Sequence, residues 1–244
     1  MKTKIVFIFF LVTIIKIIKN NKIKEIKKSN NSSITKHIFQ TSKYPIPKYV
    51  LTQNKLKFND WNYTFFSDDD IINFFINNPL KEFPDIIKKF KYFNRGEHKA
   101  DLFRYYYLYI NGGVFIDSDV LLKKNIEDII QNYDFVSVKS IVPNTLFNGF
   151  IATEKKNVII YEALKMTYTT NNIQLKKNYH LICNQLFNIY NKYHNQTNIL
   201  LKEYHDPRLN NIGVITIDNN DEHVLTHFSW SKQIPKNFKY FFHT

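Results

Sequence analysis

The chain of 244 residues contains one cysteine and five glycines, and these scarcities exclude specific classes of structure. Cys183 has no second cysteine to pair with, so no disulfide can form within the chain. A single cysteine does not decide between a reducing and an oxidising cellular compartment. The sequence has neither a G-x-G-x-x-G motif nor a Walker loop. If a nucleotide binds to this protein, glycine-rich loops are therefore not what holds its phosphates.

The basic charge lacks the pattern that nucleic-acid binding requires. More than half of the net charge of +13 lies in the first 28 residues, which hold eight lysines and one glutamate. The basic residues are mostly lysines, and they form no arginine-rich stripe and no known RNA- or DNA-binding motif. We therefore expect no nucleic-acid partner, and the mildly basic remainder suits an anionic nucleotide substrate.

The N-terminal region consists of an apolar run and a polar stretch. Residues 5–18 are apolar apart from Thr13 and Lys16, which predicts a signal-like segment or single-pass signal anchor over residues 1–19. A buried or disordered extension is the alternative, and the lysines on both sides leave the membrane orientation open. The Lys- and Asn-rich residues 20–33 predict a stem or linker, and residues 34–244 a single catalytic domain.

Apolar patterning predicts an α/β fold in this domain, because helical and strand-like segments alternate along it. Strands are expected over residues 35–40, 61–66, 114–116, 135–138 and 214–217, and helices over residues 71–77, 84–93, 97–110, 158–167 and 181–193.

The most informative segment runs from residue 98 to residue 120. Asp101 and Arg104 lie one turn apart on the predicted helix, so both side chains leave the same face, either as a surface ion pair or as parts of a site. Gly112 and Gly113 end the helix. An apolar strand follows, and its alternation places Asp117 and Asp119 on one side at its carboxyl end.

Two carboxylates at the end of a buried strand favour a divalent cation. Left alone they would repel each other and be costly to desolvate, and a bound cation removes that cost. Mn²⁺ or Mg²⁺ suits carboxylate, phosphate and water ligands, and offsets the charge that develops on a departing nucleoside diphosphate. An isolated D-x-D is a weak signal, but the order helix, two glycines, apolar strand and D-x-D is a strong one.

This segment closely resembles the D-x-D sugar-binding region of glycosyltransferase family 32. The matching residues are Ala100, Asp101, Arg104, Tyr105, Leu108, Tyr109, Gly112, Gly113, Val114, Phe115, Asp117, Asp119 and Val120. Weaker similarities occur at residues 38–41, 148–152 and 227–230. The family includes initiating α-1,6-mannosyltransferases, α-1,4-galactosyltransferases and mannosyltransferases of inositol phosphoceramides. The resemblance implies a Rossmann-like nucleotide-diphospho-sugar transferase fold of the glycosyltransferase-A type, and transfer of a hexose with retention from a UDP- or GDP-sugar to a glycan or glycolipid acceptor.

The resemblance also implies roles for individual residues. Asp101 and Arg104 would grip the donor sugar. Asp117 would contact the ribose or sugar and help to organise the metal that Asp119 binds. Further implied contacts are Gln40 and Asn148 with the substrate, His227 with the metal, and Ser229 and Trp230 with the metal or diphosphate.

The sequence departs from the family pattern at Phe39 and Ser42, where relatives carry His and Trp, and at Phe115, where relatives often carry Tyr. The Gly-Pro turn that relatives have before the late helix is also not evident around residues 169–179, which leaves the acceptor side open. We predict a membrane-associated retaining glycosyltransferase of the Golgi, another secretory membrane or a host-derived membrane. Because no carboxylate nucleophile is evident, front-face attack is favoured over a covalent intermediate. A metal-dependent nucleotidyl- or phosphotransferase and a catalytically silent binding protein are the alternatives.

Overall fold

The computed structural model describes residues 33–42, 46, 48–209 and 213–228. The predicted segments 1–19 and most of 20–33 therefore lie outside the described residues, as do Ser229 and Trp230. Among the helices of the described ranges, none is long and apolar enough to cross a membrane.

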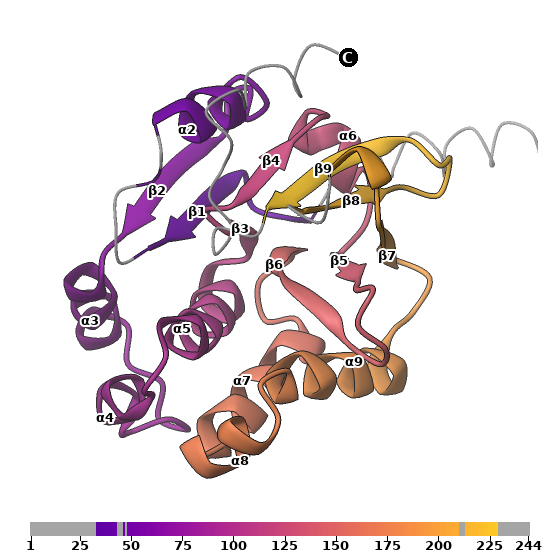
Figure 1. The fold of residues 1–244 in the computed structure, drawn as a ribbon. Helices are drawn as coiled ribbons and strands as arrows, with labels where there is room; N and C mark the ends of the chain where they lie inside the picture. The colour runs from indigo at the N-terminus through magenta and orange to yellow at the C-terminus, as the bar shows by residue number, and fades with distance from the viewer. Residues whose placement is uncertain (1–32, 43–45, 47, 210–212, 229–244) are drawn as a thin grey trace, which may run out of the picture.

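Nine strands form one mixed sheet in the described part of the chain (Figure 1). They are β1 (His37–Thr41), β2 (Asn62–Phe66), β3 (Gly113–Ile116), β4 (Val120–Leu122), β5 (Phe135–Lys139), β6 (Leu146–Thr153), β7 (Asn198–Tyr204), β8 (Gly213–Ile217) and β9 (His223–Phe228). Their order is β2-β1-β3-β6-β5-β7-β8-β9-β4. Strands β2, β1 and β3 run parallel, as do β5 and β7, and the other neighbours are antiparallel.

The helices lie on both faces of this sheet. They are α2 (Lys48–Lys55), α3 (Asp68–Asn77), α4 (Ile86–Tyr92), α5 (Gly96–Asn111), α6 (Ile126–Ile130), α7 (Val158–Thr169), α8 (Asn172–Lys177) and α9 (Leu181–Tyr193), with a 3-10 turn at Pro207–Leu209. Figure 1 shows α3, α4, α5, α7, α8 and α9 grouped together, with α2 and α6 near β4 at the other end of the molecule.

Alternation along the strands builds a separate hydrophobic core on each face. In β3, Phe115 packs into the core under α3, α4, α5, α7 and α9, while Val114 and Ile116 pack into the core that includes α6 and β4. The larger core is rich in aromatic rings: Phe39 lies 5.2 Å from Phe115 and 6.0 Å from Phe103 between ring centroids. Phe39, one of the departures from the family pattern, is thus a buried core residue.

The predicted α/β class is confirmed, with a mixed sheet that curls so that only three residues separate β3 from β4, the last strand in the order. Each predicted strand and helix coincides with an observed one to within a few residues. Helices α2, α6 and α8 and strands β4, β6, β7 and β9 were not among the predicted elements.

Candidate functional site

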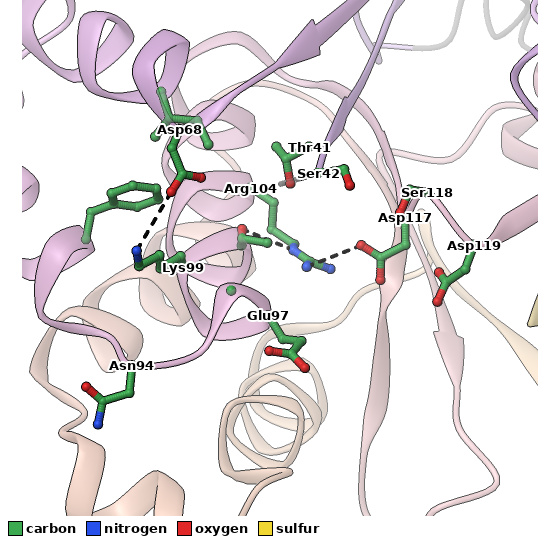
Figure 2. A pocket seen from close by; sticks show the side chains of 14 residues that line it. Thr41, Ser42, Asp68, Asn94, Glu97, Lys99, Arg104, Asp117, Ser118 and Asp119 are labelled. Carbon is green, nitrogen blue, oxygen red and sulfur yellow. Dashed lines mark hydrogen bonds and ion pairs between the residues drawn. The ribbon is translucent and has the colours of Figure 1, made fainter. Parts of the chain in front are cut away.

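A cavity of about 510 Å³ opens where the carboxyl end of β3 meets the first turns of α5 (Figure 2). Its walls come from the end of β1, from α3 and α4, from α5 and from the link between β3 and β4. The lining residues are Thr41, Ser42, Asp68, Ile71, Phe90, Asn94, Gly96, Glu97, Lys99, Ala100, Arg104, Asp117, Ser118 and Asp119. The D-x-D segment and Arg104 therefore share one cavity.

Backbone hydrogen bonds hold Asp117 and Asp119 in place. The Asp117 N–H donates to the Gly149 carbonyl at 2.8 Å, and the Val120 N–H donates to the Asp117 carbonyl at 3.1 Å. The Phe228 N–H donates to the Asp119 carbonyl at 2.9 Å. The two carboxylates thus sit in a turn braced by β6 on one side and β9 on the other.

Arg104 is the central cation of the site. It is 3% exposed, and its guanidinium donates to the Asn148 carbonyl and lies 3.4 Å from both Asp101 Oδ1 and Asp117 Oδ1. The guanidinium carbon stands 4.1 Å from the centre of the Phe115 ring. Burial acts to lower the pKa of Arg104, but Asp117 and Asp101 outweigh it and raise that pKa above its ordinary value. Arg104 therefore stays charged.

Asp101 and Asn148 are joined beneath the cavity. The Asn148 amide donates to Asp101 Oδ1 at 2.9 Å and accepts the Tyr105 hydroxyl proton at 2.8 Å. His98 approaches the other Asp101 oxygen at 3.6 Å. Asp101 and Asn148 are 6% and 5% exposed, and neither is among the cavity-lining residues of the described structure. Both residues contact the Arg104 guanidinium, Asn148 through its carbonyl and Asp101 through its carboxylate.

The pKa of the Asp117 carboxyl is raised. Burial raises its pKa from 3.8 to about 6; Arg104 opposes this rise, and the neighbouring Asp119 carboxylate adds to it. A carboxylate that is costly to ionise in the free protein is stabilised by an added cation.

Gln40 supports the backbone of the same turn. Its side-chain amide donates to the Asp117 carbonyl at 3.2 Å and accepts the Tyr63 hydroxyl proton at 3.0 Å. Gln40 is fully buried, so its amide is used within the protein.

His227 lies beside Asp119 because β4 and β9 pair with Val120 opposite His227. Its Nε2 is 3.5 Å from Asp119 Oδ2, and its ring stacks on Phe147 at 4.2 Å between centroids. Burial acts to lower the pKa of His227, but the Asp119 carboxylate and then Glu203 outweigh it and raise that pKa above 6.5.

The donor set suits a metal that also takes ligands from its substrate. Among the described residues, no three histidine, cysteine, aspartate or glutamate side chains are gathered as a protein-only metal site would need. Asp119 and His227 converge as a pair, and Asp117 stands next to them with a raised pKa. Such a partial set fits Mn²⁺ or Mg²⁺, which commonly complete their shells with phosphate oxygens and water.

Four contributors to this site received no role in the sequence analysis. They are His98, which lies 3.6 Å from Asp101, Tyr105, which donates to Asn148, Glu203 behind His227, and Gly149. A Cβ added at Gly149 would lie 2.7 Å from Asp117 Oδ2 and closer still to the Phe147 ring. The scarcity of glycine was the available signal for Gly149, whereas Glu203 offered none, because its partners are distant in sequence.

The comparisons with known proteins agree with this geometry. The family model "Glycosyltransferase sugar-binding region containing DXD motif" matches residues 17–136. The uncharacterized glycosyltransferase L373 of Acanthamoeba polyphaga mimivirus is 30% identical over 124 residues, which cover 49% of this chain and 48% of that protein.

Two fungal proteins are also similar. Inositol phosphoceramide mannosyltransferase 1 of Schizosaccharomyces pombe is 27% identical over 43% of this chain and 32% of its own length. The initiation-specific α-1,6-mannosyltransferase of Saccharomyces cerevisiae is 38% identical over 28% of this chain and 14% of its own length.

A solved structure, the PaToxG glycosyltransferase, matches with a TM-score of 0.48 and 17% identity over 72% of this chain and 79% of that one. The chain spans about half of the viral relative and less of the fungal ones. The resemblance drawn from residues 98–120 is thus confirmed: residues 17–136 match the model of the glycosyltransferase sugar-binding region containing the DXD motif, and the similar proteins are named as glycosyltransferases.

Proposed function

We propose that this protein is a metal-dependent, retaining hexosyltransferase that uses a UDP- or GDP-hexose and a glycan or glycolipid acceptor. The observation that carries the proposal is the convergence of Asp117, Asp119 and Arg104 on one cavity at the carboxyl end of β3. This is the edge of an α/β sheet where ligands commonly bind. The names of the fungal relatives favour mannose as the hexose.

In this proposal, Asp119 and His227 would hold Mn²⁺ or Mg²⁺, with Asp117 supporting them. The metal would offset negative charge on the leaving diphosphate. Arg104 contacts the donor, while Asp101, Asn148 and Tyr105 keep its guanidinium in position. We assign Gln40 to positioning the turn at Asp117, in place of the substrate contact expected from the sequence.

The surroundings of the carboxylates favour front-face attack. Asp101 and Asp117 are both held by Arg104, which makes either a poor nucleophile. The Cys183 thiol is also disfavoured, because burial and then the Asp101 charge raise its pKa to about 12. The donor's own leaving phosphate is then the base that accepts the acceptor proton on the same face of the sugar.

The domain organisation belongs to the same proposal. Residues 34–244 form the catalytic domain, residues 20–33 a stem, and the apolar residues 1–19 attach the protein to a membrane of the secretory pathway or to a host-derived membrane. The support for this part is the composition of those segments.

The test is a panel of UDP- and GDP-sugars with the full chain, in Mn²⁺ and in chelator, following both hydrolysis and transfer. We expect Mn²⁺-dependent turnover that falls on the order of 100-fold or more in Asp119→Ala, since a contact to charge that develops in the reaction has at least that effect. Asp128→Ala on the exposed side of α6 is the matched control and should keep full activity. No turnover of any nucleotide sugar by the wild type would refute the proposal, and phosphotransfer without sugar transfer would favour the alternative enzyme class.

A further inference from the structure

A second cavity of about 390 Å³ opens beside the D-x-D cavity, and the proposed donor site does not use it. Its walls come from the link between β5 and β6, from β6 itself, from the first turn of α9, from the end of β7 and from β8 and β9. Small-molecule sites are commonly cavities of this kind, mostly apolar and with a few placed polar groups.

The stacked rings of Phe147 and His227 separate the two cavities. Both rings line the second cavity, and they lie 4.2 Å apart between centroids. On the other side, His227 Nε2 is 3.5 Å from Asp119 Oδ2, which lines the first cavity. The Phe147 ring and Asp117 Oδ2 both lie within 2.7 Å of the position that a Cβ on Gly149 would take, so this ring is also next to Asp117. A molecule in the second cavity would therefore lie next to the donor site, where a second substrate has to be.

Glu203 brings a hydrogen-bond acceptor without a donor to this cavity. Its side chain is 2% exposed, and it is one of the lining residues. The Oε2 atom accepts the Ser140 hydroxyl proton at 2.6 Å and the Ile141 N–H at 3.0 Å. The Oε1 atom accepts no hydrogen bond from any residue that the structure describes, and His227 Nδ1, at 3.9 Å, is too distant to donate one. A buried carboxylate oxygen without a donor is costly, and a ligand hydroxyl would supply the donor.

Much of the remaining wall is apolar. Val142, Leu146 and Val214 line the cavity together with Ile141, whose exposed fraction of 37% places it at the outer side. Leu146 is fully buried. The cavity thus offers a carboxylate and an aromatic ring on its inner side and an aliphatic surface toward solvent. A purely hydrophilic ligand would leave that aliphatic surface in water, whereas a ligand with an apolar group would cover it.

The charge of the cavity favours an uncharged ligand. No lysine or arginine is among the lining residues in the described ranges, so a phosphate group would meet the Glu203 carboxylate without a fixed cation to offset the repulsion. Sugar hydroxyls suit such a carboxylate, and the C–H face of a pyranose can pack on the ring of Phe147.

We propose that the second cavity is the acceptor site and that it takes an uncharged glycolipid. The terminal sugar packs on Phe147 and donates a hydroxyl proton to Glu203, while the apolar aglycone covers Ile141 and Val142. The inference rests on the proposed function and narrows its acceptor from a glycan or glycolipid to a glycolipid. Glu203 positions a hydroxyl that neighbours the attacking one, and the proton of the attacking hydroxyl still passes to the leaving phosphate of the donor.

The test compares acceptors that differ only in the aglycone. Methyl and octyl glycosides of mannose, galactose and glucose, with the octyl compounds below their micelle concentrations, are offered to the full chain with the nucleotide sugar that it hydrolyses. The ratio of transfer to hydrolysis is measured, because this ratio does not depend on how much of the protein is active. For the wild type, we expect kcat/KM for an octyl glycoside to exceed that for its methyl partner by about 10-fold or more.

Two variants separate the apolar contact from the polar one. Ile141→Ser should reduce the preference for octyl over methyl by about 3- to 10-fold. Ile76→Ser on α3 is the matched control, because Ile76 is 59% exposed and lines neither cavity, and it should keep the preference. Glu203→Gln should lower the transfer-to-hydrolysis ratio about 10-fold for both members of a pair, since a hydrogen bond to a charged acceptor is lost. A merely structural loss would lower transfer and hydrolysis together and leave the ratio as it was.

The outcomes distinguish the acceptor site from the donor site. Equal use of methyl and octyl glycosides by the wild type, or hydrolysis without transfer to any of them, would overturn the inference and leave the donor site standing. A preference that persists in Ile141→Ser, or a ratio that is unchanged in Glu203→Gln, would place the acceptor elsewhere and overturn it as well. If the wild type hydrolyses no nucleotide sugar at all, the proposed function fails and the inference fails with it.

Discussion

At the scale of one residue, the partly buried Asp117 carboxylate lowers the stability of the ligand-free protein. Its side chain is 29% exposed, and it lies between the Arg104 guanidinium and the Asp119 carboxylate. The pKa of about 6 means that burial costs the ionised form more than Arg104 returns to it. A cation that bound beside Asp117 would remove this penalty.

Asp117→Asn should therefore stabilise the metal-free protein at neutral pH. Because the folded-state pKa is raised above 3.8, the folded protein binds this proton more tightly than the unfolded chain, and stability falls as pH rises from 3.8 through about 6. At ~1.4 kcal/mol per pKa unit, the penalty at neutral pH is at most ~3 kcal/mol. In chelator, the melting temperature of Asp117→Asn should exceed that of the wild type at ~pH 7 and match it at ~pH 4.

An exposed carboxylate provides the comparison for this experiment. Asp128→Asn on the exposed side of α6 is the control for the removal of one negative charge. A melting-temperature difference for Asp117→Asn that is the same at both pH values would contradict the assignment of the raised pKa to Asp117.

At this scale, the sequence predicted the site only where residues of suitable chemistry lie close together along the chain. Asp101, Arg104, Asp117 and Asp119 lie within 19 consecutive residues, so periodicity alone could place them together. Glu203 meets His227 only because β7, β8 and β9 are neighbours in the sheet. That adjacency depends on the whole fold, and no local pattern encodes it.

At the scale of elements, the tight connection between α5 and β3 sets the geometry of the site. Gly112 ends the helix with φ +67° and ψ −162°, a conformation that side chains rarely adopt. A Cβ there would lie 2.7 Å from the Lys155 backbone nitrogen. This connection brings Arg104 on α5 to the same cavity as Asp117, which follows β3.

Gly112→Ala should consequently destabilise the protein by about 2 kcal/mol or more, since it combines a strained φ with a backbone clash. For a chain of this size, we expect a fall in melting temperature of roughly 4 to 8 °C, measured by circular dichroism. Gly96→Ala is the control at the opposite end of the same helix, where a Cβ would meet nothing within 4 Å. Gly96→Ala should be neutral or slightly stabilising, and equal losses in both variants would show that Gly112 has no special role.

The elements that sequence analysis missed depend on partners distant in the chain. β4 has three residues, too few to show a period. It is held by β9 and by the buried Asn54 of α2, whose amide donates to the Val120 carbonyl at 2.8 Å and accepts from the Leu122 N–H at 2.9 Å. Strands β3 and β5 could be predicted because each is an apolar run whose side chains divide between the two cores, whereas the longer strands β6 and β7 were missed.

At the scale of the whole molecule, the D-x-D segment connects an interior strand of the curled sheet with its edge strand. β3 lies in the interior of the sheet order, yet the next strand, β4, is the outermost strand beyond β9. The crossing takes only residues 117–119, so Asp117 stays with α5 and β6 while Asp119 reaches β9. A ligand that contacts both carboxylates would connect β3, in the interior of the strand order, with the edge formed by β4 and β9 (Figure 1).

Binding of metal and nucleoside diphosphate should therefore be cooperative and should stabilise the entire fold. At a ligand concentration of 100 times Kd, the stabilisation is about 2.7 kcal/mol, and the corresponding rise in melting temperature is roughly 5 to 10 °C. We expect the shift with Mn²⁺ and UDP or GDP together to exceed the sum of the separate shifts, because Asp119 and His227 supply only part of a coordination shell. Asp119→Asn should abolish the excess and keep any shift due to nucleotide alone, and the corresponding monophosphates should give no excess with the wild type. Additive shifts in the wild type would mean that metal and diphosphate bind independently, which is incompatible with a shared site at Asp117 and Asp119.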